Sequence, residues 1–273
     1  MAKIVSAYCQ SHIMFNPDGA PEQCGAVFDA YKEVGEGVRN SKPDVIVILT
    51  GDHYFNVKTD IEIPLAVSVG AQHTPFGDMD IPKKPFKGHP EFAQGFINFA
   101  TEKGFDLGKL HEEGFAPDHG VAMPVMFSNP TGEIPTIVIN MNINMSPVPT
   151  PRRVFELGRA LREYIDTVRP DDERVAVLAT GGLSHWLNVE GDGKINEEWD
   201  RETLKLFADG RGKELADKSA DWILENAGNG GLEMLFWVMM AGVIPEAKGR
   251  EIFYEPIYSW KTGMGAVEMQ VAA

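Results

Sequence analysis

Five side chains stand in short sequence settings whose residue types could do chemistry together. They are four histidines and one glutamate: His12, His53, His119, His185 and Glu233. Two histidines and one carboxylate on a rigid scaffold form the facial triad that holds non-haem Fe(II) and leaves coordination positions open. Two further histidines could then move protons, because imidazole titrates closest to neutral pH. The set therefore indicates metal-dependent chemistry assisted by proton transfer.

The candidate metal ligands each have a plainer interpretation. His12 follows Ser11 and His53 follows Gly51-Asp52, so both could be partly buried histidines that end strands. Glu233 has mainly apolar neighbours, among which a carboxylate is costly unless it is paired or metal-bound. An exposed glutamate in the first turn of a helix, where the helix dipole favours it, is the alternative.

The two other histidines lie in segments that contain glycine. His185 ends the segment Thr180-Gly181-Gly182-Leu183-Ser184-His185, in which paired glycines permit tight turns and the close approach of a ligand. A turn that only ends a strand and a phosphate-binding loop are the alternatives, although no Lys-Ser/Thr pair follows. His119 lies in Pro117-Asp118-His119-Gly120, which has the composition of a turn. The remaining histidines are expected to be structural or exposed: His73, His89 and His111.

The chain alternates between strand-like and helical patterns. Continuous apolar runs rich in β-branched residues are typical of strands buried on both faces. Five such runs occur: Ile4–Tyr8, Val45–Leu49, Leu65–Val69, Thr136–Met141 and Val175–Ala179. Helical patterns occupy residues 27–38, 92–99, 150–168, 197–226 and a last helix that carries Glu233, and Thr150-Pro151 supplies an N-cap. The alternation predicts an α/β fold with a central, mostly buried β-sheet flanked by helices.

The order of the elements predicts where the site lies. His12, His53 and His185 each follow a predicted strand, and ligands of open α/β sheets bind beyond the carboxyl ends of the strands. We therefore expect the active site at that edge of the sheet. No repeat or linker divides the chain, which predicts one catalytic domain over residues 1–273. Residues 72–88 are rich in Pro, Gly, Lys and Asp and predict a long loop of the kind that covers sites.

Charge and composition argue against other classes of protein. The formal net charge of −15 repels phosphate backbones, which argues against nucleic-acid binding. Cys9 and Cys24 are too few for a disulfide framework, and the N-terminal residues show no signal-peptide pattern. The longest apolar stretch, residues 232–244, is too short to span a bilayer. These features predict a cytoplasmic protein without membrane contact.

Short motifs in order along nearly the whole chain resemble the class III (LigB-type) extradiol ring-cleavage dioxygenases, and among them the catalytic subunits that cleave protocatechuate. The motifs are Ser11-His12-Ile13, Asp52-His53, Lys87-Gly88-His89-Pro90, Asp118-His119-Gly120, Thr180-Gly181-Gly182-Leu183-Ser184-His185, Ile195-Asn196-Glu197-Glu198-Trp199-Asp200, Leu232-Glu233 and Gly265-Ala266. Each motif is common by itself, whereas the ordered set is specific.

The resemblance implies a role for each matched residue. His12, His53 and Glu233 would hold one Fe(II) per chain, with Mn(II) as the alternative ion. His185 would be the catalytic acid and base, and His119 a second catalytic histidine near substrate and dioxygen. The backbone strip beside the substrate would consist of Thr180, Gly181 and Gly182.

The resemblance also implies the substrates and partners. A protocatechuate-like or other substituted catechol would react with O2 by extradiol (meta) cleavage to a 2-hydroxymuconic semialdehyde-type product. Trp186 stands where a Gln is expected, and Lys261 lies in the region that contacts a substrate carboxylate, so both are expected to contact substrate. A solvent-facing lysine is the alternative for Lys261. A homo-oligomer, or a complex with a small α-type subunit, is expected.

Two other functions use the same residues. A zinc-dependent hydrolase could be built on the same metal triad, although zinc more often takes a closed tetrahedron or an activated water. A non-catalytic binding module with the family fold is the second alternative. Every ligand expected of the dioxygenases is present in this chain, which favours ring cleavage.

Overall fold

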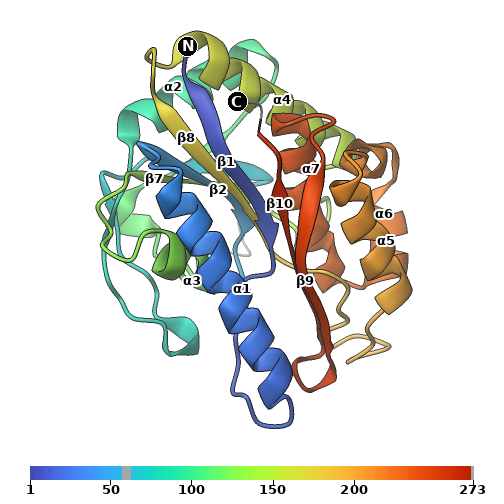
Figure 1. The fold of residues 1–273 in the computed structure, drawn as a ribbon. Coiled ribbons are helices and arrows are strands. Elements are labelled where there is room, and N and C mark those ends of the chain that lie inside the picture. Colours follow the sequence, from blue (N-terminus) through green and yellow to red (C-terminus); the bar gives the residue numbers. More distant parts are fainter. Residues whose placement is uncertain (57–62, 272–273) are drawn as a thin grey trace.

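The computed structural model describes residues 1–56 and 63–271, which surround a mixed sheet of eight strands in the order β6-β3-β7-β2-β8-β1-β10-β9 (Figure 1). The inner strands β7, β2, β8 and β1 run parallel to one another, whereas β3 pairs with β7, and β10 with β1 and β9, in antiparallel fashion. The sheet strands are β1 (Lys3–Gln10), β2 (Val45–Gly51), β3 (Leu65–Ser68), β6 (Gly108–Leu110), β7 (Thr136–Met141), β8 (Arg174–Thr180), β9 (Gly249–Ile257) and β10 (Thr262–Met269). A separate hairpin consists of β4 (Gln72–His73) and β5 (Phe86–Lys87).

Helices cover both faces of the sheet. Those of the described residues are α1 (Pro21–Asn40), α2 (Pro90–Glu102), α3 (His119–Ser128), α4 (Pro151–Val168), α5 (Glu197–Ala208), α6 (Ala220–Ala227) and α7 (Met234–Val243). Along β2, Ile46 and Ile48 pack with α1 and α3, whereas Val45, Val47 and Leu49 pack with α2, α4 and α7. This alternation follows from the two-residue period of a strand, and it explains why the inner strands are apolar throughout.

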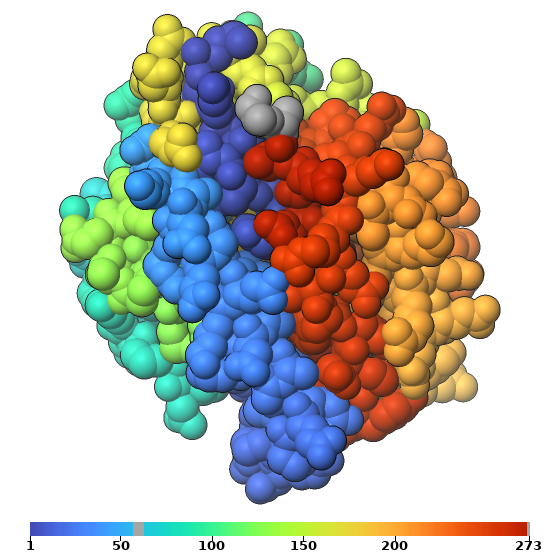
Figure 2. Space-filling view, viewed as in Figure 1, coloured from blue at the N-terminus to red at the C-terminus, as the bar shows by residue number. Residues whose placement is uncertain are grey.

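The hairpin formed by β9 and β10 extends the sheet at one edge. The two strands lie beside α1 on one surface of the molecule (Figure 2). Ser11 joins this hairpin to the end of β1, because its amide donates to the Gly265 carbonyl at 2.9 Å and its Oγ accepts from the Gly265 amide at 3.0 Å. The segment that leads to His12 is therefore fixed by a strand from the far end of the chain.

Most predicted elements are confirmed. All five predicted strands are present, and Thr150 caps α4 by accepting from the Arg153 amide at 3.2 Å, with Pro151 in the first turn. The predicted helix over residues 197–226 is instead α5, a short 3-10 helix and α6. The prediction missed α3, β6, β9 and β10, and the 72–88 loop is bracketed by β4 and β5. The predicted α/β class with a buried sheet is confirmed.

Two predictions concern the whole chain, whereas the structure describes only part of it. The single-domain prediction covers residues 1–273, of which 57–62 and 272–273 lie outside the described residues, and it stays a prediction. Within the described parts of the chain, no helix combines the length and apolar composition that crossing a membrane requires.

Candidate metal and catalytic site

Three neighbouring parallel strands bring the predicted histidines to one edge of the sheet. His12 follows β1 and His53 follows β2, while β8, which lies between them, leads through Gly181 and Gly182 to His185. Glu233 ends a short 3-10 helix, Gly230–Glu233, that continues into α7. Because these strands are parallel, their carboxyl ends meet, and the site forms there as predicted from strand order.

One carboxylate oxygen lies between two imidazoles. Oε1 of Glu233 is 3.3 Å from Nε2 of His12 and 3.1 Å from Nε2 of His53. The His12 and His53 rings are 5.0 Å apart and nearly perpendicular. His12 and Glu233 are buried, so the carboxylate is not the exposed first-turn residue of the alternative interpretation. Two imidazole nitrogens and a carboxylate oxygen that converge on one point are a suitable donor set for a divalent transition metal.

The second ring nitrogen of His12 and of His53, Nδ1, contacts a residue outside this group of three side chains. Oδ2 of Asp118 accepts hydrogen bonds from the backbone amide of His53 at 2.7 Å and from its Nδ1 at 3.0 Å. Nδ1 of His12 lies 3.3 Å from Oγ1 of Thr180. Oε2 of Glu233 accepts from the amide of Gly182. Hydrogen bonds to the side chains that bind a metal fix the orientation of their rings, and here the contacts direct both Nε2 atoms toward Oε1 of Glu233.

The ionisation of the three side chains is coupled. Burial lowers the pKa of His53, but hydrogen bonds to Asp118 and Glu233 outweigh burial and raise it to about 10. Burial lowers the pKa of His12, and the neighbouring Glu233 opposes that shift. Burial raises the pKa of Glu233, yet His12 and His53 bring it well below its ordinary value. Without a metal, a proton on an imidazole balances the negative charge of the Glu233 carboxylate. A metal ion can take the place of that proton, since imidazole must be deprotonated to bind a metal.

His119 is the third imidazole of the cluster. Its ring lies 4.0 Å from that of His53 and 5.2 Å from that of His12, and the ligand atoms of the three histidines are within 4.8 Å of one another. A three-histidine ligand set is therefore possible. We favour the set with Glu233, because its oxygen already lies between two Nε2 atoms while Nδ1 of His119 is 2.5 Å from Oδ2 of Asp78.

His185 stands beside this cluster with one nitrogen occupied. Its Nδ1 is 2.9 Å from the Leu183 carbonyl, which can only accept, so the hydrogen is on Nδ1 and Nε2 has a free lone pair. A Cβ on Gly230 would lie 1.8 Å from that Nε2, so only glycine fits against the ring. The geometry suits a base that takes and returns a proton.

A buried carboxylate that sequence analysis did not single out supports the loop before His185. Asp200 accepts from the amide of Ser184 at 2.8 Å, from its Oγ at 3.0 Å and from the Tyr254 hydroxyl at 2.9 Å. Burial raises the pKa of Asp200 to about 7. The sequence does mark this residue, because Asp200 ends one of the motifs that carry the family resemblance.

Two cavities meet at the site. The first, of about 560 Å³, is mainly apolar; the second has a volume of about 580 Å³. Of the residues that the structure describes, the two cavities share His53, His185, Leu187 and Glu233 in their linings. The first cavity is lined by Ser11, His12, Ile13, Phe15, Asn16, Asp18, His53, His119, Gly182, His185, Leu187, Glu233, Ser259, Trp260, Lys261, Thr262 and Met264. Both cavities thus border the cluster.

The predicted substrate contacts lie in different places. Gly182 and Lys261 line the first cavity, where Lys261 forms an ion pair with Asp192. Thr180 supports His12, and Gly181 lies against Glu233, where its φ of +110° and the missing Cβ permit close approach. Trp186 lines neither cavity; Lys194 lies 4.5 Å over its ring, and the tryptophan packs beneath Gly228.

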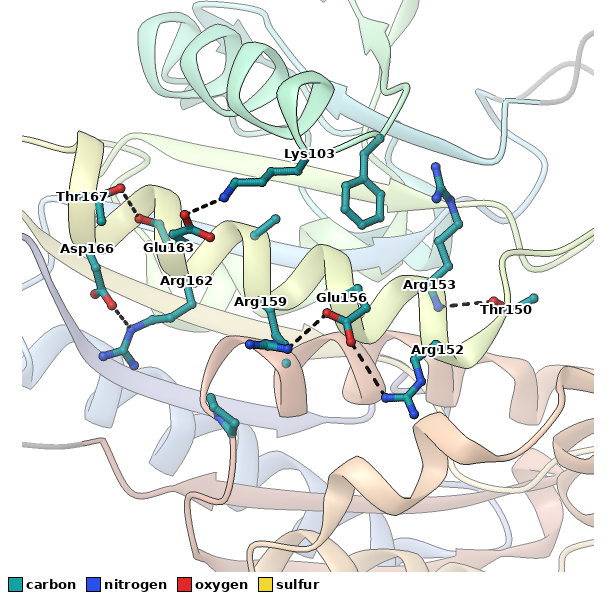
Figure 3. A pocket seen from close by; sticks show the side chains of 14 residues that line it. Lys103, Thr150, Arg152, Arg153, Glu156, Arg159, Arg162, Glu163, Asp166 and Thr167 are labelled. Carbon is teal, nitrogen blue, oxygen red and sulfur yellow. Dashed lines mark hydrogen bonds and ion pairs between the residues drawn. The ribbon is translucent and has the colours of Figure 1, made fainter.

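A larger groove lies on α4, and none of the described residues lines both this groove and either cavity (Figure 3). Four of its basic side chains are paired locally: Arg152 and Arg159 with Glu156, Arg162 with Asp166, and Lys103 with Glu163. Arg153 instead donates to the Gly104 carbonyl and lies over the Phe105 ring. Among the described residues, the lining of this groove contains no histidine or cysteine. The chemistry therefore belongs to the histidine cluster.

Comparison with known proteins identifies the family of the chain. The family described as "Catalytic LigB subunit of aromatic ring-opening dioxygenase" matches residues 6–268. A 2,3-dihydroxyphenylpropionate/2,3-dihydroxicinnamic acid 1,2-dioxygenase from Photorhabdus laumondii is 28% identical, over 97% of this chain and 97% of its own. A gallate dioxygenase from Pseudomonas putida is 29% identical, over 60% of this chain and 48% of its own.

A solved structure has the same fold. The crystal structure of an uncharacterized protein from Escherichia coli K12 matches with a TM-score of 0.64 and 15% identity, over 97% of this chain and 100% of that one. The family match begins within β1 and ends within β10, so it includes every residue of the cluster. The chain belongs to the LigB family, the catalytic subunits of aromatic ring-opening dioxygenases.

Proposed function

We propose that this chain cleaves a substituted catechol by extradiol addition of both atoms of O2, with one Fe(II) held by His12, His53 and Glu233. The observation that carries the proposal is the Glu233 carboxylate, which lies within 3.3 Å of two inward-facing imidazole nitrogens beside an apolar cavity of about 560 Å³. That volume and lining suit an aromatic ring. The family match supports the reaction class.

The metal and the protein have separate tasks. Fe(II), when bound, would supply open coordination positions for both reactants and a route for electrons between them. His185, through Nε2, would take the proton of a substrate hydroxyl and later return it to oxygen, while the Leu183 carbonyl keeps the other ring nitrogen protonated. The apolar wall formed with Met264 and Trp260 would exclude water around the ring.

The substrate class is a catechol with an acidic substituent. The relatives are named for 2,3-dihydroxyphenylpropionate and gallate, both of which are aromatic acids, and Lys261 is the one lysine or arginine among the described residues that line the first cavity. Its present partner is Asp192, which a substrate carboxylate would have to displace or join. A protocatechuate-like ring fits this description, and the 2-hydroxymuconic semialdehyde-type product follows from cleavage beside the diol.

Oxygen uptake by anaerobically purified, iron-loaded protein tests the proposal. A panel of catechol, protocatechuate, gallate and 2,3-dihydroxyphenylpropionate should show consumption of one O2 per ring and a yellow ring-opened product with at least one member. Metal analysis on the same preparation distinguishes iron from zinc, and a zinc-loaded protein that hydrolyses esters without oxygen uptake would point to the hydrolase instead. A protein that binds catechols yet consumes no O2 with either Fe(II) or Mn(II) would be a binding module.

The assembly of the chain is a separate proposal. A homo-oligomer or a small α-type partner subunit stays a prediction, which light scattering of the purified chain tests directly. Activity of the isolated chain on the catechol panel would show that no second subunit is needed for catalysis.

A further inference from the structure

We propose that Asp78 is a positioning residue, which holds His119 with its hydrogen on Nδ1 and so presents Nε2 of that histidine to the reacting ring. The inference deepens the proposed function and rests on it. Oδ2 of Asp78 is 2.5 Å from Nδ1 of His119 and 3.3 Å from the backbone amide of the same residue. One carboxylate thus fixes both the ring and the start of α3.

The direction of this hydrogen bond follows from the groups involved. An ionised carboxylate can only accept, so Nδ1 of His119 must donate, and the second ring nitrogen is the one left for the cavity. The same arrangement occurs in His53 with Asp118 and in His185 with the Leu183 carbonyl. Without Asp78, the His119 ring would be free to rotate or to carry its hydrogen on the other nitrogen, beside His12 and His53.

The residues on either side of Asp78 have left-handed backbone conformations. Gly77 has φ of +86°, and two residues that are not glycine follow at positive φ, Met79 at +53° and Asp80 at +57°. Residues other than glycine rarely adopt positive φ and persist there where the surroundings enforce it. The enforcement here is local: the Phe76 amide donates to the Pro117 carbonyl at 2.8 Å, immediately before α3.

A second anchor lies on the other side of Asp78. Ile81 is buried in the same apolar cluster as Ala122 and Met123 of α3, with Met79 packed against it. The loop is thus tied to the helix that carries His119 both before and after the aspartate. A connection that is anchored on both sides in this way fixes the position of Asp78 relative to His119.

The second oxygen of Asp78 argues that the carboxylate serves the site. Among the described residues, Oδ1 is buried and has no hydrogen-bond partner. An unpaired buried oxygen disfavours folding, and an apolar residue there would avoid its desolvation. The aspartate is therefore explained by its contact with His119, which an apolar residue could not make.

A double-mutant cycle tests the inference on iron-loaded protein. Asp78→Ala should lower kcat by roughly 10- to 100-fold, as the loss of outer-shell partners does, with iron content unchanged. Asp78→Asn, which keeps an acceptor oxygen and the side-chain volume, should lie in between. In the His119→Ala background Asp78→Ala should change kcat by less than about twofold, because the two residues act as one unit. Equal losses in both backgrounds would show a merely structural role and overturn the proposal.

Asp80→Asn is the matched control. Asp80 is exposed in the same strained turn, so its variant should keep wild-type kcat and melting temperature. A loss in this variant as large as that of Asp78→Ala would assign the effect to the turn and overturn the proposal.

A spectroscopic measurement separates this inference from the proposed function. Long-range ¹H–¹⁵N correlation on metal-free protein, assigned with His119→Ala, should show the Nδ1–H form of His119 in the wild type and its loss in Asp78→Ala. Persistence of the Nδ1–H form without Asp78 would contradict the inference even if the enzyme is fully active. If no ring cleavage is found with any catechol, the correlation still decides the role of Asp78.

Discussion

Nε2 of His53 lies 3.1 Å from Oε1 of Glu233, although 180 positions separate the two residues in the sequence. Both belong to the boundary of the first cavity, and the carboxylate is almost fully buried. Removal of one partner of a buried charge pair leaves the other uncompensated, which is more damaging than loss of an exposed pair.

Glu233→Gln should release the metal. The amide keeps the volume of the side chain but carries no charge to balance a divalent cation, so affinity for Fe(II) should fall by more than the roughly 10- to 100-fold typical of outer-shell losses. Iron per chain after gel filtration is the measurement, with exposed Glu225→Gln on α6 as the control. Full iron occupancy in Glu233→Gln would refute this ligand assignment and favour the three-histidine set.

Metal binding should release protons at neutral pH. The pKa of His53 is raised to about 10 in the metal-free protein, so this ring is protonated at pH 7 and must lose its proton to bind a metal. Titration calorimetry with Fe(II) in buffers of different ionisation enthalpy should give about one proton released per ion, and affinity should rise with pH. Asp118→Asn removes one of the groups that raise the pKa, so it should release less. Equal heats in all buffers would contradict the prediction.

His185→Phe should separate binding from turnover. The variant keeps the three ligands, so iron content and catechol binding should persist, while kcat should fall by ~10²–10⁴-fold because no group moves the proton. Stopped-flow spectra of the anaerobic catechol complex report binding independently of turnover. Unchanged turnover would exclude His185 as the acid and base.

His73→Leu should stabilise the protein, and most of all in acid. His73 is buried between Phe86 and Phe115, neither ring nitrogen has a partner among the described residues, and burial lowers its pKa to about 4. Its folded pKa is below the unfolded one, so the unfolded chain binds the proton more readily, and stability falls as pH decreases from about 6.5 through 4.

The size of this effect can be measured by thermal unfolding between pH 4.5 and 8. Removing two unsatisfied nitrogens should add about 1–3 kcal/mol to the free energy of unfolding, or roughly 2–4 °C per kcal/mol for a protein of this length. The wild type should lose stability toward pH 4.5 and the variant should lose less. Exposed His111→Leu is the control. A parallel pH dependence of His73→Leu and wild type would disprove the sign worked out here.

Lys261→Met should change substrate preference. Lys261 lines the first cavity, and a cation that pairs with a desolvated carboxylate contributes far more than an exposed pair. KM for a carboxylated catechol should rise roughly tenfold, while KM for unsubstituted catechol should stay within about twofold. Lys213→Met, which breaks an exposed pair with Glu246, is the control. Equal effects on both substrates would place substrate selection elsewhere, with Trp260 the next residue to test.

The parts of the fold that could be predicted are those whose local sequence pattern is typical of one kind of element. β2, β7 and β8 are apolar because helices cover both faces, and α4 has a cap and one apolar stripe. β9 was missed because it is an edge strand of mixed polarity, with Pro256 near its end. α3 was missed because it is apolar all round and contains Pro124, so no helical periodicity marks it.

The site was predictable to a similar depth. Strand order places His12, His53 and His185 at one edge, and the family resemblance assigned roles to them and to Glu233. The contact between Asp78 and His119 could not be foreseen, because it depends on a turn whose strained backbone no local pattern encodes. Trp186 shows the opposite limit, since it follows His185, the proposed acid and base, in the sequence but does not line the first cavity.

The pairing of β1 with β10 has a consequence for how a cell makes this protein. His12 is synthesised before its carboxylate neighbour Glu233 and before residues 262–269, which form the strand that pairs with β1. An interrupted or truncated copy therefore carries scattered histidines without an assembled centre. The order of synthesis therefore sets the earliest moment at which the proposed metal site can be complete.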